Sequence, residues 1–294
     1  MKQLLIISGK GGTGKTTIAG AFIKLSGAKA FADCDVEAPN MHLLLNKGYI
    51  CSSSAYYGLD TAMIDPDRCN GCGCCLELCR FSAVSSGETY AIDPRLCEGC
   101  ALCMEFCPAE AISMKKQQAG RLELCRSEDG RKIFSGAELN TGSGTSGKLV
   151  AEVKNQLKKN AGAAETAVID GPPGTGCPVI ASLNEADMAL IVTEPSVSGI
   201  NDMKRVLDTL KNFKTKAAVC INKYDMNTEK SEEIKAFCRK EGVRYTGRIP
   251  FDPDLPAAAG MEAALPQRGC HAENAIKTIF FNTMILMSED SGDK

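Results

Sequence analysis

Eight of the sixteen cysteines form two short motifs whose spacing is typical of metal-cluster ligands. Each motif reads C-x2-C-x2-C-x3-C, and the two-residue gaps let one short loop direct three thiolates at a single cluster. In proteins with two such clusters, the fourth cysteine of each motif ligates the other cluster. The spacing therefore predicts two [4Fe-4S] clusters. The first would be held by Cys69, Cys72, Cys75 and Cys107, and the second by Cys79, Cys97, Cys100 and Cys103.

Zinc is the alternative metal for closely paired cysteines. A zinc site would use two C-x2-C pairs and would leave the third and fourth cysteines of each motif without a role. Iron–sulfur clusters are therefore favoured. The first motif (Cys69–Cys79) is followed by Arg80, whereas the second motif (Cys97–Cys107) is followed by the usual proline, Pro108. Cys74 lies within the first motif but out of register, and we expect it not to be a ligand.

A glycine-rich segment, Gly9–Thr17, joins an apolar run at residues 2–8 to a helix-like stretch that ends near residue 26. The order strand, loop, helix and the pattern G-x4-G-K-T are those of a phosphate-binding loop. Its backbone N–H groups surround phosphate oxygens, and the helix N-terminus adds a favourable dipole. We expect Lys15 to reach the β- and γ-phosphates and Thr16 to bind Mg²⁺. The predicted nucleotide-binding residues here are Gly11, Gly12, Thr13, Gly14, Lys15, Thr16 and Thr17.

Lys10 is an additional lysine in this loop, and KGGTGKT resembles the deviant Walker A motif of the MinD/ParA family of ATPases. That family includes the nitrogenase iron protein and the Mrp-type cluster carriers. The resemblance implies that Lys10 reaches across a nucleotide-sandwich dimer to the phosphates of the partner. It therefore implies a homodimer, or a heterodimer with a related ATPase. A solvated loop lysine is the alternative reading of Lys10.

Two further segments resemble the switch regions of this family, one after a short apolar strand and one at the end of another. Asp33–Asn40 is similar to the first switch, in which Asp35 would orient the attacking water. Val168–Asp170 is similar to the Walker B motif and opens into GPPGTG, where the Gly174 backbone would sense the γ-phosphate. The resemblance implies that the catalytic residues are Lys10, Lys15 and Asp35. It also implies that Mg²⁺ is held by Thr16, Asp35 and Asp170.

The segment Asn222–Asp225 reads N-K-x-D and leaves two interpretations for the base of the nucleotide. In GTPases the aspartate of this pattern reads guanine, whereas the resemblance to MinD-like proteins implies that Asn222 reads adenine. Pro250 lies in Ile249–Asp252, which resembles the loop that flanks the base in that family. We expect ATP or ADP as the nucleotide, with GTP as the less favoured alternative.

Apolar runs that alternate with helical periodicity indicate the elements that position these residues. Strands are predicted at residues 2–8, 28–33, 166–170, 187–193, 216–222 and 243–249. Helices are predicted at residues 15–26, 147–159, 199–212, 229–241 and 270–287. This alternation predicts the α/β class, with a doubly wound, mostly parallel sheet of the P-loop NTPase type. The phosphate loop and both switches would then lie at the carboxyl ends of the strands.

The cysteine motifs interrupt this pattern as an insert. The predicted domains are a discontinuous P-loop ATPase domain at 1–62 and 116–294, and a small α+β ferredoxin-like domain with two clusters at 63–115. I-D-P precedes both motifs, starting at Ile64 and at Ile92, as expected of a duplicated ferredoxin. A β-hairpin with its turn at Asp129-Gly130 is predicted at residues 120–135. Gly142–Lys148 resembles a second phosphate loop, but Leu149 stands where that motif has a serine or threonine to bind Mg²⁺. We therefore expect this segment to start a helix.

Composition limits the classes of partner. The net charge of −2 and the absence of tryptophan argue against nucleic-acid binding. No apolar run approaches the length of a membrane span, and the chain ends in the acidic SEDSGDK, so neither a spanning nor an amphipathic membrane helix is expected. The apolar stripe near the C-terminus is instead predicted to dock on the ATPase domain. The cysteine count without a secretion signal predicts a cytoplasmic protein with reduced thiols and no disulfides.

These motifs leave three functional hypotheses. The leading one is an ATP-hydrolysing redox protein, in which nucleotide-driven dimerisation gates electron transfer through the two clusters to a partner. Residues 63–115 carry eight acidic and four basic side chains, so a basic partner is favoured. The alternative is a factor that assembles or carries iron–sulfur or heterometal clusters for a client protein. A spatial-positioning ATPase like MinD is the least favoured.

Overall fold

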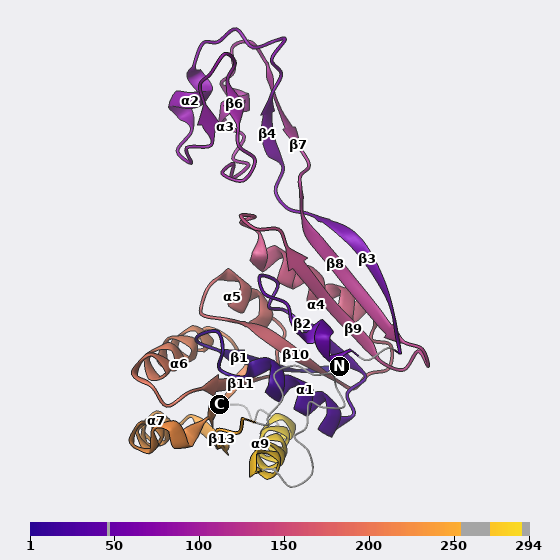
Figure 1. Cartoon of the computed structure of the whole chain (residues 1–294), viewed down its shortest axis with the longest axis vertical. Helices are drawn as coiled ribbons and strands as arrows, with labels where there is room; N and C mark the ends of the chain where they lie inside the picture. The colour runs from indigo at the N-terminus through magenta and orange to yellow at the C-terminus, as the bar shows by residue number, and fades with distance from the viewer. Residues whose placement is uncertain (46–47, 254–270, 290–294) are drawn as a thin grey trace.

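Continuous apolar runs form the central strands of a large sheet, because helices cover both of its faces. The computed structural model describes residues 1–45, 48–253 and 271–289, and in that part of the chain the main sheet has nine strands (Figure 1). Their order is β13 (Arg244–Ile249), β12 (Lys216–Asn222), β11 (Met188–Thr193), β1 (Lys2–Ser8), β10 (Thr166–Pro173), β2 (Ala30–Asp33), β9 (Ile133–Leu139), β8 (Gln118–Ser127) and β3 (Tyr49–Tyr57). The strands from β13 to β9 pair in parallel, and β8 and β3 extend the sheet in antiparallel pairing. The predicted α/β class and mostly parallel sheet are confirmed.

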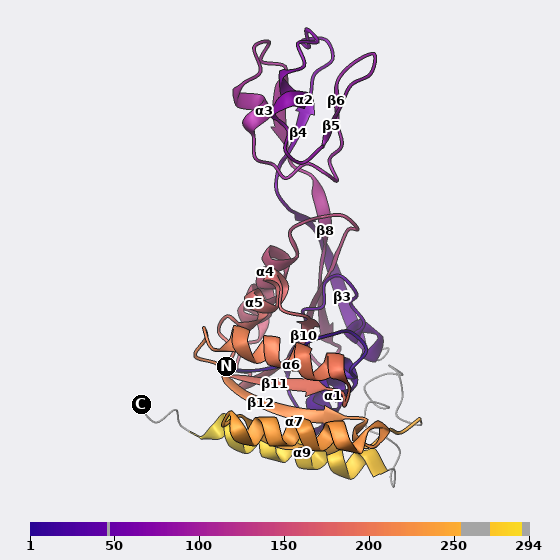
Figure 2. The same ribbon diagram turned by 90° about the vertical axis from the view of Figure 1, so that its left-hand side faces the viewer.

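Helices form a layer on each face of the sheet (Figure 2). One face is covered by α4 (Ser146–Asn160), α5 (Cys177–Leu183), α6 (Val197–Leu210) and α7 (Thr228–Lys240). The other face is covered by α1 (Lys15–Ser26), the short 3-10 helix η1 (Met41–Leu44) and α9 (His271–Ser288). A second 3-10 helix, η2 (Tyr224–Met226), follows β12. Each layer buries its own apolar cluster, so the sheet separates two cores.

The C-terminal helix α9 packs on the body, as its apolar stripe predicted. Ile276 and Ile279 are completely buried, and the Phe280 ring meets the Phe22 ring edge-on at a centroid distance of 5.2 Å. In the part of the chain that the structure describes, no helix has the length and apolar character to cross a membrane. Cys270, the first residue of the predicted C-terminal helix, lies outside the described residues, as do the last five residues of the acidic SEDSGDK segment.

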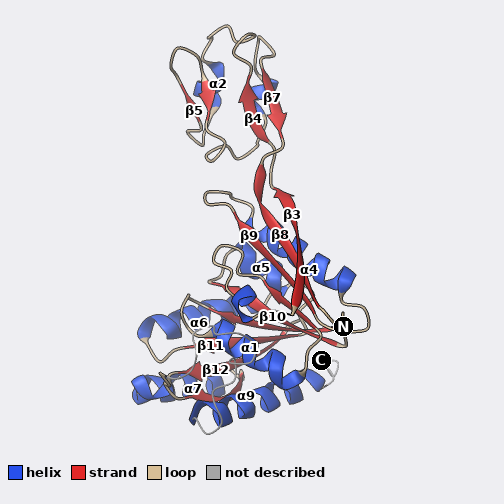
Figure 3. Ribbon diagram, turned by 45° about the vertical axis from the view of Figure 1, so that its right-hand side comes forward, coloured by secondary structure: helices blue, strands red, loops and turns tan. Residues whose placement is uncertain are grey.

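Strands β3 and β8 form an antiparallel arm that leaves the body, which is the large sheet with its helices (Figures 1 and 3). The arm carries a small lobe formed by residues 61–115. The lobe contains two small antiparallel sheets and two short helices. These elements are β4 (Thr61–Ile64) with β7 (Ile112–Lys115), β5 (Val84–Ser85) with β6 (Ala91–Ile92), α2 (Cys74–Leu78) and α3 (Leu102–Glu105). Few large side chains are buried in the lobe: Ala62, Ala83, Val84, Ala111 and Ile112 are its buried apolar residues. Both cysteine motifs lie in this lobe.

The predicted strands and helices are present, with ends that differ by a few residues. The predicted hairpin is also present as β8 and β9, and Gly130 in its turn has a left-handed backbone at φ 68°. In the body, β3, α5 and the two 3-10 helices were not predicted, and the short strands and helices of the lobe were not predicted individually. Strand β3 lies at the edge of the sheet and exposes most of its residues, so it lacks the apolar pattern that marks the central strands. The predicted helix-initiating role of the second glycine-rich segment is confirmed, because α4 begins at Ser146.

The prediction that the chain has no disulfides is wrong. A disulfide joins Cys51 on β3 to Cys125 on β8, with the two Cα atoms 4.0 Å apart. The two residues are separated by 74 positions in sequence, and the whole lobe lies between them. Sequence spacing could not reveal this pair, because only the register of β3 against β8 brings the two cysteines opposite each other.

Candidate nucleotide site and cysteine lobe

The predicted phosphate loop connects β1 to α1 at the carboxyl end of the sheet. Gly14 has a left-handed backbone at φ 91°, and a side chain there would meet the Asn222 amide nitrogen at 2.5 Å. Only glycine is free of both constraints at this position. The Asn222 Nδ2 donates a hydrogen bond to the Thr13 carbonyl at 2.8 Å. The loop is therefore held from the side by β12, two strands away from β1 in the sheet.

Thr16 and Asp170 lie together, as predicted for residues that share a magnesium ion. The Thr16 hydroxyl donates to Asp170 Oδ2 at 2.5 Å. Asp170 is completely buried, and its Oδ1 has no hydrogen-bond partner among the described residues. Burial raises the pKa of Asp170, and the neighbouring Asp33 carboxylate raises it further. A buried carboxylate with one free oxygen beside a hydroxyl fits a hard divalent cation, which would supply the missing positive charge.

Asp35 and Lys15 face each other, with 3.7 Å between Lys15 Nζ and Asp35 Oδ2. Burial raises the pKa of Asp35 to about 6, although the Lys15 ammonium opposes the shift. Asp33 positions this segment, because its carboxylate accepts the backbone N–H groups of Asp35, Asn40 and Met41. The predicted catalytic residues Lys15 and Asp35 are therefore close together and share one electrostatic environment.

Lys10 is paired within its own chain by Glu194, a residue that the sequence reasoning missed. The distance from Lys10 Nζ to Glu194 Oε2 is 3.2 Å, and Lys223 Nζ lies 2.6 Å from Glu194 Oε1. Partial burial of Glu194 opposes ionisation, but the hydrogen bonds from Lys223 and Lys10 prevail and lower its pKa. Lys223 also donates to the Gly12 carbonyl, at 3.4 Å. Lys10 is thus not a freely solvated loop lysine in this conformation.

The predicted base-reading residues lie beyond the phosphate loop, at the ends of β12 and β13. The amide of Asn222 is occupied on both sides, since its Oδ1 accepts the Lys223 N–H in addition to the contact with Thr13. Asp225 Oδ1 accepts the Phe251 N–H at 2.7 Å, which ties η2 to the residue after Pro250. Gly174, the predicted sensor of the γ-phosphate, donates its N–H to the Ser8 carbonyl at 2.9 Å.

The cysteines predicted for the first cluster line one recess of the lobe. Cys69, Cys72, Cys75 and Cys107 all border a space of about 320 Å³, counting its opening to solvent. Tyr90, Ile64 and Ile112 are among the other side chains at its wall. The Ala111 N–H donates to Cys107 Sγ at 3.3 Å, the kind of contact that stabilises a thiolate ligand. Cys74 also borders this recess, although the spacing predicted no role for it.

Three cysteines predicted for the second cluster also lie close together. Burial raises the pKa of the Cys103 thiol, and Cys97 and Cys100 are near enough to raise it further. Cys97 Sγ accepts the Ala62 N–H at 3.4 Å. Cys79 ends α2, which packs against α3 from the second motif.

The spread of these sulfur atoms argues against zinc. Tetrahedral zinc bonds of about 2.3 Å place thiolates about 3.8 Å apart. In the described part of the chain, which includes both motifs, no three motif sulfurs lie within 4.8 Å of one another. A four-iron cube binds each thiolate through a different iron and so accepts wider spacing. The described residues therefore hold no preformed zinc site among the motif cysteines.

The comparisons with known proteins agree with the nucleotide site. Residues 4–263 match the CobQ/CobB/MinD/ParA nucleotide binding domain. The chain belongs to this family. It is 35% identical to an uncharacterized protein of Methanocaldococcus jannaschii over 282 residues, which cover 95% of each chain. It is 29% identical to an iron–sulfur cluster carrier protein of Pyrococcus horikoshii, over 41% of this chain and 45% of that protein.

The family membership is also visible in the fold. The septum site-determining protein MinD of Pyrococcus horikoshii, solved with Mg-ADP, superimposes with a TM-score of 0.56 at 17% identity and covers 98% of this chain. MinD of Pyrococcus furiosus gives a TM-score of 0.55 at 18% identity. The structure adds two residues to the predicted nucleotide site. Glu194 pairs with Lys10, and Asp33 holds the segment that carries Asp35.

Proposed function

We propose that this protein is an ATP-hydrolysing iron–sulfur protein, in which nucleotide binding between two copies gates electron transfer through two [4Fe-4S] clusters to a partner protein. One observation carries this proposal. The glycine-rich segment Gly142–Lys148 lies beside Arg95 and Glu98 at the second cysteine motif and packs against the helix that follows the predicted nucleotide-sensing loop. The segment therefore offers a direct mechanical route between nucleotide and clusters.

At the nucleotide end of this route, Gly147 lies against Cys177. A Cβ atom at Gly147 would be 3.2 Å from both the Cβ and the carbonyl oxygen of Cys177. Cys177 is the first residue of α5 and directly follows the GPPGTG loop. A shift of that loop toward Gly147 would therefore displace the start of α4, because the contact is too close for even a methyl group.

At the lobe end of the route, the same segment faces the second cysteine motif. A Cβ atom at Gly142 would lie 3.8 Å from Arg95 Cβ, and one at Gly144 would lie 3.7 Å from both carboxylate oxygens of Glu98. Arg95 and Glu98 flank Cys97. Lys148 adds a contact with the arm, since its Nζ donates to the Gly58 carbonyl at 3.4 Å.

The chain's own residues supply a switch at the nucleotide end. The Gly174 N–H must release the Ser8 carbonyl before it can bond a γ-phosphate, so nucleotide binding would shift the loop that leads to Cys177. Lys10 must leave Glu194 before it can reach a partner, and Lys223 stays with Glu194 when it does. Thr16, Asp35 and Asp170 would hold Mg²⁺, which would neutralise phosphate charge when bound.

The same site supports ATP in preference to GTP. An aspartate that reads guanine needs its carboxylate free to accept the ring N1–H and the exocyclic amino group of the base. Here one oxygen of Asp225 already accepts the Phe251 N–H. We expect the protein to bind ATP at least about tenfold more tightly than GTP, and Asp225→Ala to leave that preference unchanged. A preference for GTP that Asp225→Ala abolishes would contradict this part of the proposal.

In the lobe, the cysteines would bind two clusters that accept and pass on single electrons. The N–H groups of Ala62 and Ala111 stabilise ligand sulfurs in the two sets. Cys72 and Cys100 are exposed, so each set comes to the surface where a partner could approach. The acidic excess of the lobe favours a basic partner.

The experiment compares electron transfer with and without ATP. Reduced protein is mixed anaerobically with a one-electron acceptor protein, and the rate is followed by cluster absorbance. We expect ATP to change the rate at least about fivefold, and Gly147→Ala to abolish the change because its methyl group displaces Cys177. Gly48→Ala is the matched control, since a Cβ at Gly48 meets nothing within 4 Å. Equal rates with and without ATP in the unmodified protein would contradict the proposal.

The second candidate function is cluster delivery, and the partial similarity to iron–sulfur cluster carrier proteins favours it. A carrier would lose its clusters to a client during nucleotide turnover, whereas a redox protein would keep them. Iron content of the re-isolated protein after turnover with an apo-ferredoxin distinguishes the two. Retention of the iron supports electron transfer, and stoichiometric loss to the apo-ferredoxin supports delivery.

A further inference from the structure

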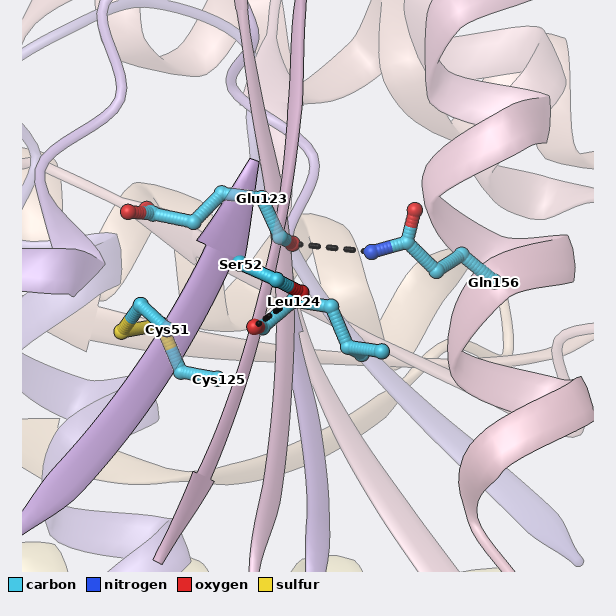
Figure 4. The surroundings of a disulfide bond; sticks show 6 residues. All are labelled: Cys51, Ser52, Glu123, Leu124, Cys125 and Gln156. Carbon is cyan, nitrogen blue, oxygen red and sulfur yellow. Dashed lines mark hydrogen bonds between the residues drawn. A yellow bond between two sulfur atoms is a disulfide. The ribbon is translucent and has the colours of Figure 1, made fainter. Parts of the chain in front are cut away.

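The disulfide between Cys51 and Cys125 joins β3 to β8 within the arm, and neither cysteine belongs to a cysteine motif (Figure 4). Its two sulfur atoms have different surroundings. Cys125 is completely buried in the core beside Phe134 and Phe31, whereas Cys51 is exposed on the edge strand β3. An external thiol can therefore reach only one of the two sulfurs.

A carboxylate stands beside this pair. Glu123 lies two residues before Cys125 on β8, and the two side chains therefore share one face of the strand. The sulfur atoms of Cys51 and Cys125 and a carboxylate oxygen of Glu123 lie within 4.8 Å of one another. Glu123 is partly exposed, so its carboxylate connects the buried sulfur with solvent.

A permanent structural disulfide does not suit a protein with so many thiols in metal-ligand spacing. Such thiols need reducing surroundings, and in the cytosol of mesophiles the few disulfides that form are mostly transient, catalytic or redox-sensing. We propose that Cys51 and Cys125 form a thiol–disulfide exchange centre that reacts with external dithiols, and that its state sets how firmly β3 is held to the sheet. This inference concerns residues outside the nucleotide and cluster sites and does not depend on the function proposed above.

The reaction balances with the dithiol as reductant. One thiolate of the dithiol attacks Cys51 Sγ, the bond between Cys51 and Cys125 breaks, and Cys125 leaves as a thiolate. Glu123 passes a proton from solvent to Cys125. The second thiolate of the dithiol then attacks the mixed disulfide and releases Cys51, which takes up another proton. Two electrons and two protons pass to the protein, and the dithiol becomes a disulfide.

Opening this bond loosens β3 alone. Strand β8 stays fixed from two other sides, by its pairing with β9 and by Gln156 of α4, whose Nε2 donates to the Glu123 carbonyl at 3.0 Å (Figure 4). Among the described residues, strand β3 has β8 as its one neighbour in the sheet. Apart from the disulfide, it is held by the ladder and by the hydrogen bonds from Ser52 Oγ to the Leu124 carbonyl at 3.3 Å and from the Tyr56 hydroxyl to the Thr145 carbonyl at 3.4 Å. The Tyr49 ring also meets the Phe31 ring edge-on at a centroid distance of 6.4 Å.

The test uses the cluster-loaded protein under anaerobic conditions, with acid quenching and alkylation before peptide mass spectrometry. The linked Cys51–Cys125 peptide should disappear with dithiothreitol in the absence of denaturant and return with oxidised glutathione. In Cys125→Ser, Cys51 should form a mixed disulfide with glutathione, whereas Cys125 in Cys51→Ser should stay unmodified. A linkage that dithiothreitol opens only in denaturant, or a preferential modification of Cys125, would overturn the proposal.

Two further measurements separate exchange chemistry from a structural role. Glu123→Gln should slow reduction about tenfold and change the pH dependence of its rate, whereas Glu138→Gln on the neighbouring strand should do neither.

Hydrogen exchange of the amides in Tyr49–Tyr57 should speed up about tenfold after reduction, while exchange in β1 stays the same. Identical reduction rates and pH profiles for the two glutamate variants would exclude a role for Glu123, and unchanged exchange in β3 would exclude control of the arm.

Discussion

Lys10 and Glu194 form an ion pair of 3.2 Å within one copy of the chain. The family resemblance assigns Lys10 to the partner's nucleotide, but in this conformation Lys10 contacts a residue of its own chain. Glu194 is shared with Lys223, which can keep the carboxylate neutralised when Lys10 leaves. In the proposed mechanism, this ion pair belongs to the state before dimerisation.

The first prediction concerns Lys10. Lys10→Ala should lower ATP hydrolysis by at least about 10²-fold and abolish ATP-dependent dimerisation, because the partner's phosphates lose a cation. Cluster absorbance should not change, since Lys10 belongs to the body and not to the lobe. Hydrolysis and light scattering are the measurements, and Lys29→Ala, an exposed lysine remote in sequence from the loop, is the control. Unchanged hydrolysis in Lys10→Ala would refute the assigned role.

The second prediction concerns Asp35 and pH. Asp35→Asn should lower the hydrolysis rate by about 10²-fold while nucleotide binding persists, because the attacking water loses its acceptor. The ionised form is required, and burial raises the pKa of Asp35 to about 6. The rate should therefore be constant at higher pH and fall about tenfold per pH unit below that value. A rate that rises as the pH falls below 6 would contradict this assignment.

The third prediction concerns Asp170, whose pKa is raised by burial and by Asp33. The unfolded chain releases this proton at lower pH than the folded protein, so the free energy of unfolding should fall as pH rises. Without Mg²⁺, Tm should thus decrease from about pH 6 to about pH 8, and Asp170→Asn should flatten this decrease. Thermal unfolding monitored by circular dichroism measures both. Asp170→Asn should also lose the stabilisation that Mg²⁺ and nucleotide give together. An equally steep decrease in the variant would argue against Asp170 as its source.

The fourth prediction separates the two cluster sets. Cys107→Ser and Cys79→Ser should each remove about half of the bound iron, because each removes one ligand of a different cluster. Cys74→Ser should keep all of the iron, although Cys74 borders the first recess. Iron and sulfide analysis, with electron paramagnetic resonance of the reduced protein, reports the outcome. Bound zinc in place of iron, or full iron loss in Cys74→Ser, would contradict the assigned ligands.

The local sequence was sufficient to predict the strands that are buried on both faces of the sheet. The strands β1, β10, β11 and β12 were predicted because their apolar runs are nearly continuous. The phosphate loop was predicted because all of its functional groups lie within a few residues. Its glycines let the backbone wrap around phosphate, its lysine supplies positive charge, and its threonine can bind Mg²⁺. Strand β3 was missed because an edge strand needs no such run and is recognised only by its pairing with β8.

The sequence by itself determined the α/β class, the phosphate loop and the grouping of cysteines, since each depends on residues that are close in the chain. Tertiary structure alone decided the relationships between distant segments. It brought Glu194 to Lys10, left one oxygen of Asp170 without a hydrogen-bond partner in the described structure, and set Cys51 opposite Cys125. It also placed Gly142–Lys148 between the lobe and α5. Such contacts depend on strand order and register, which are set by the packing of the whole sheet and not by any single segment.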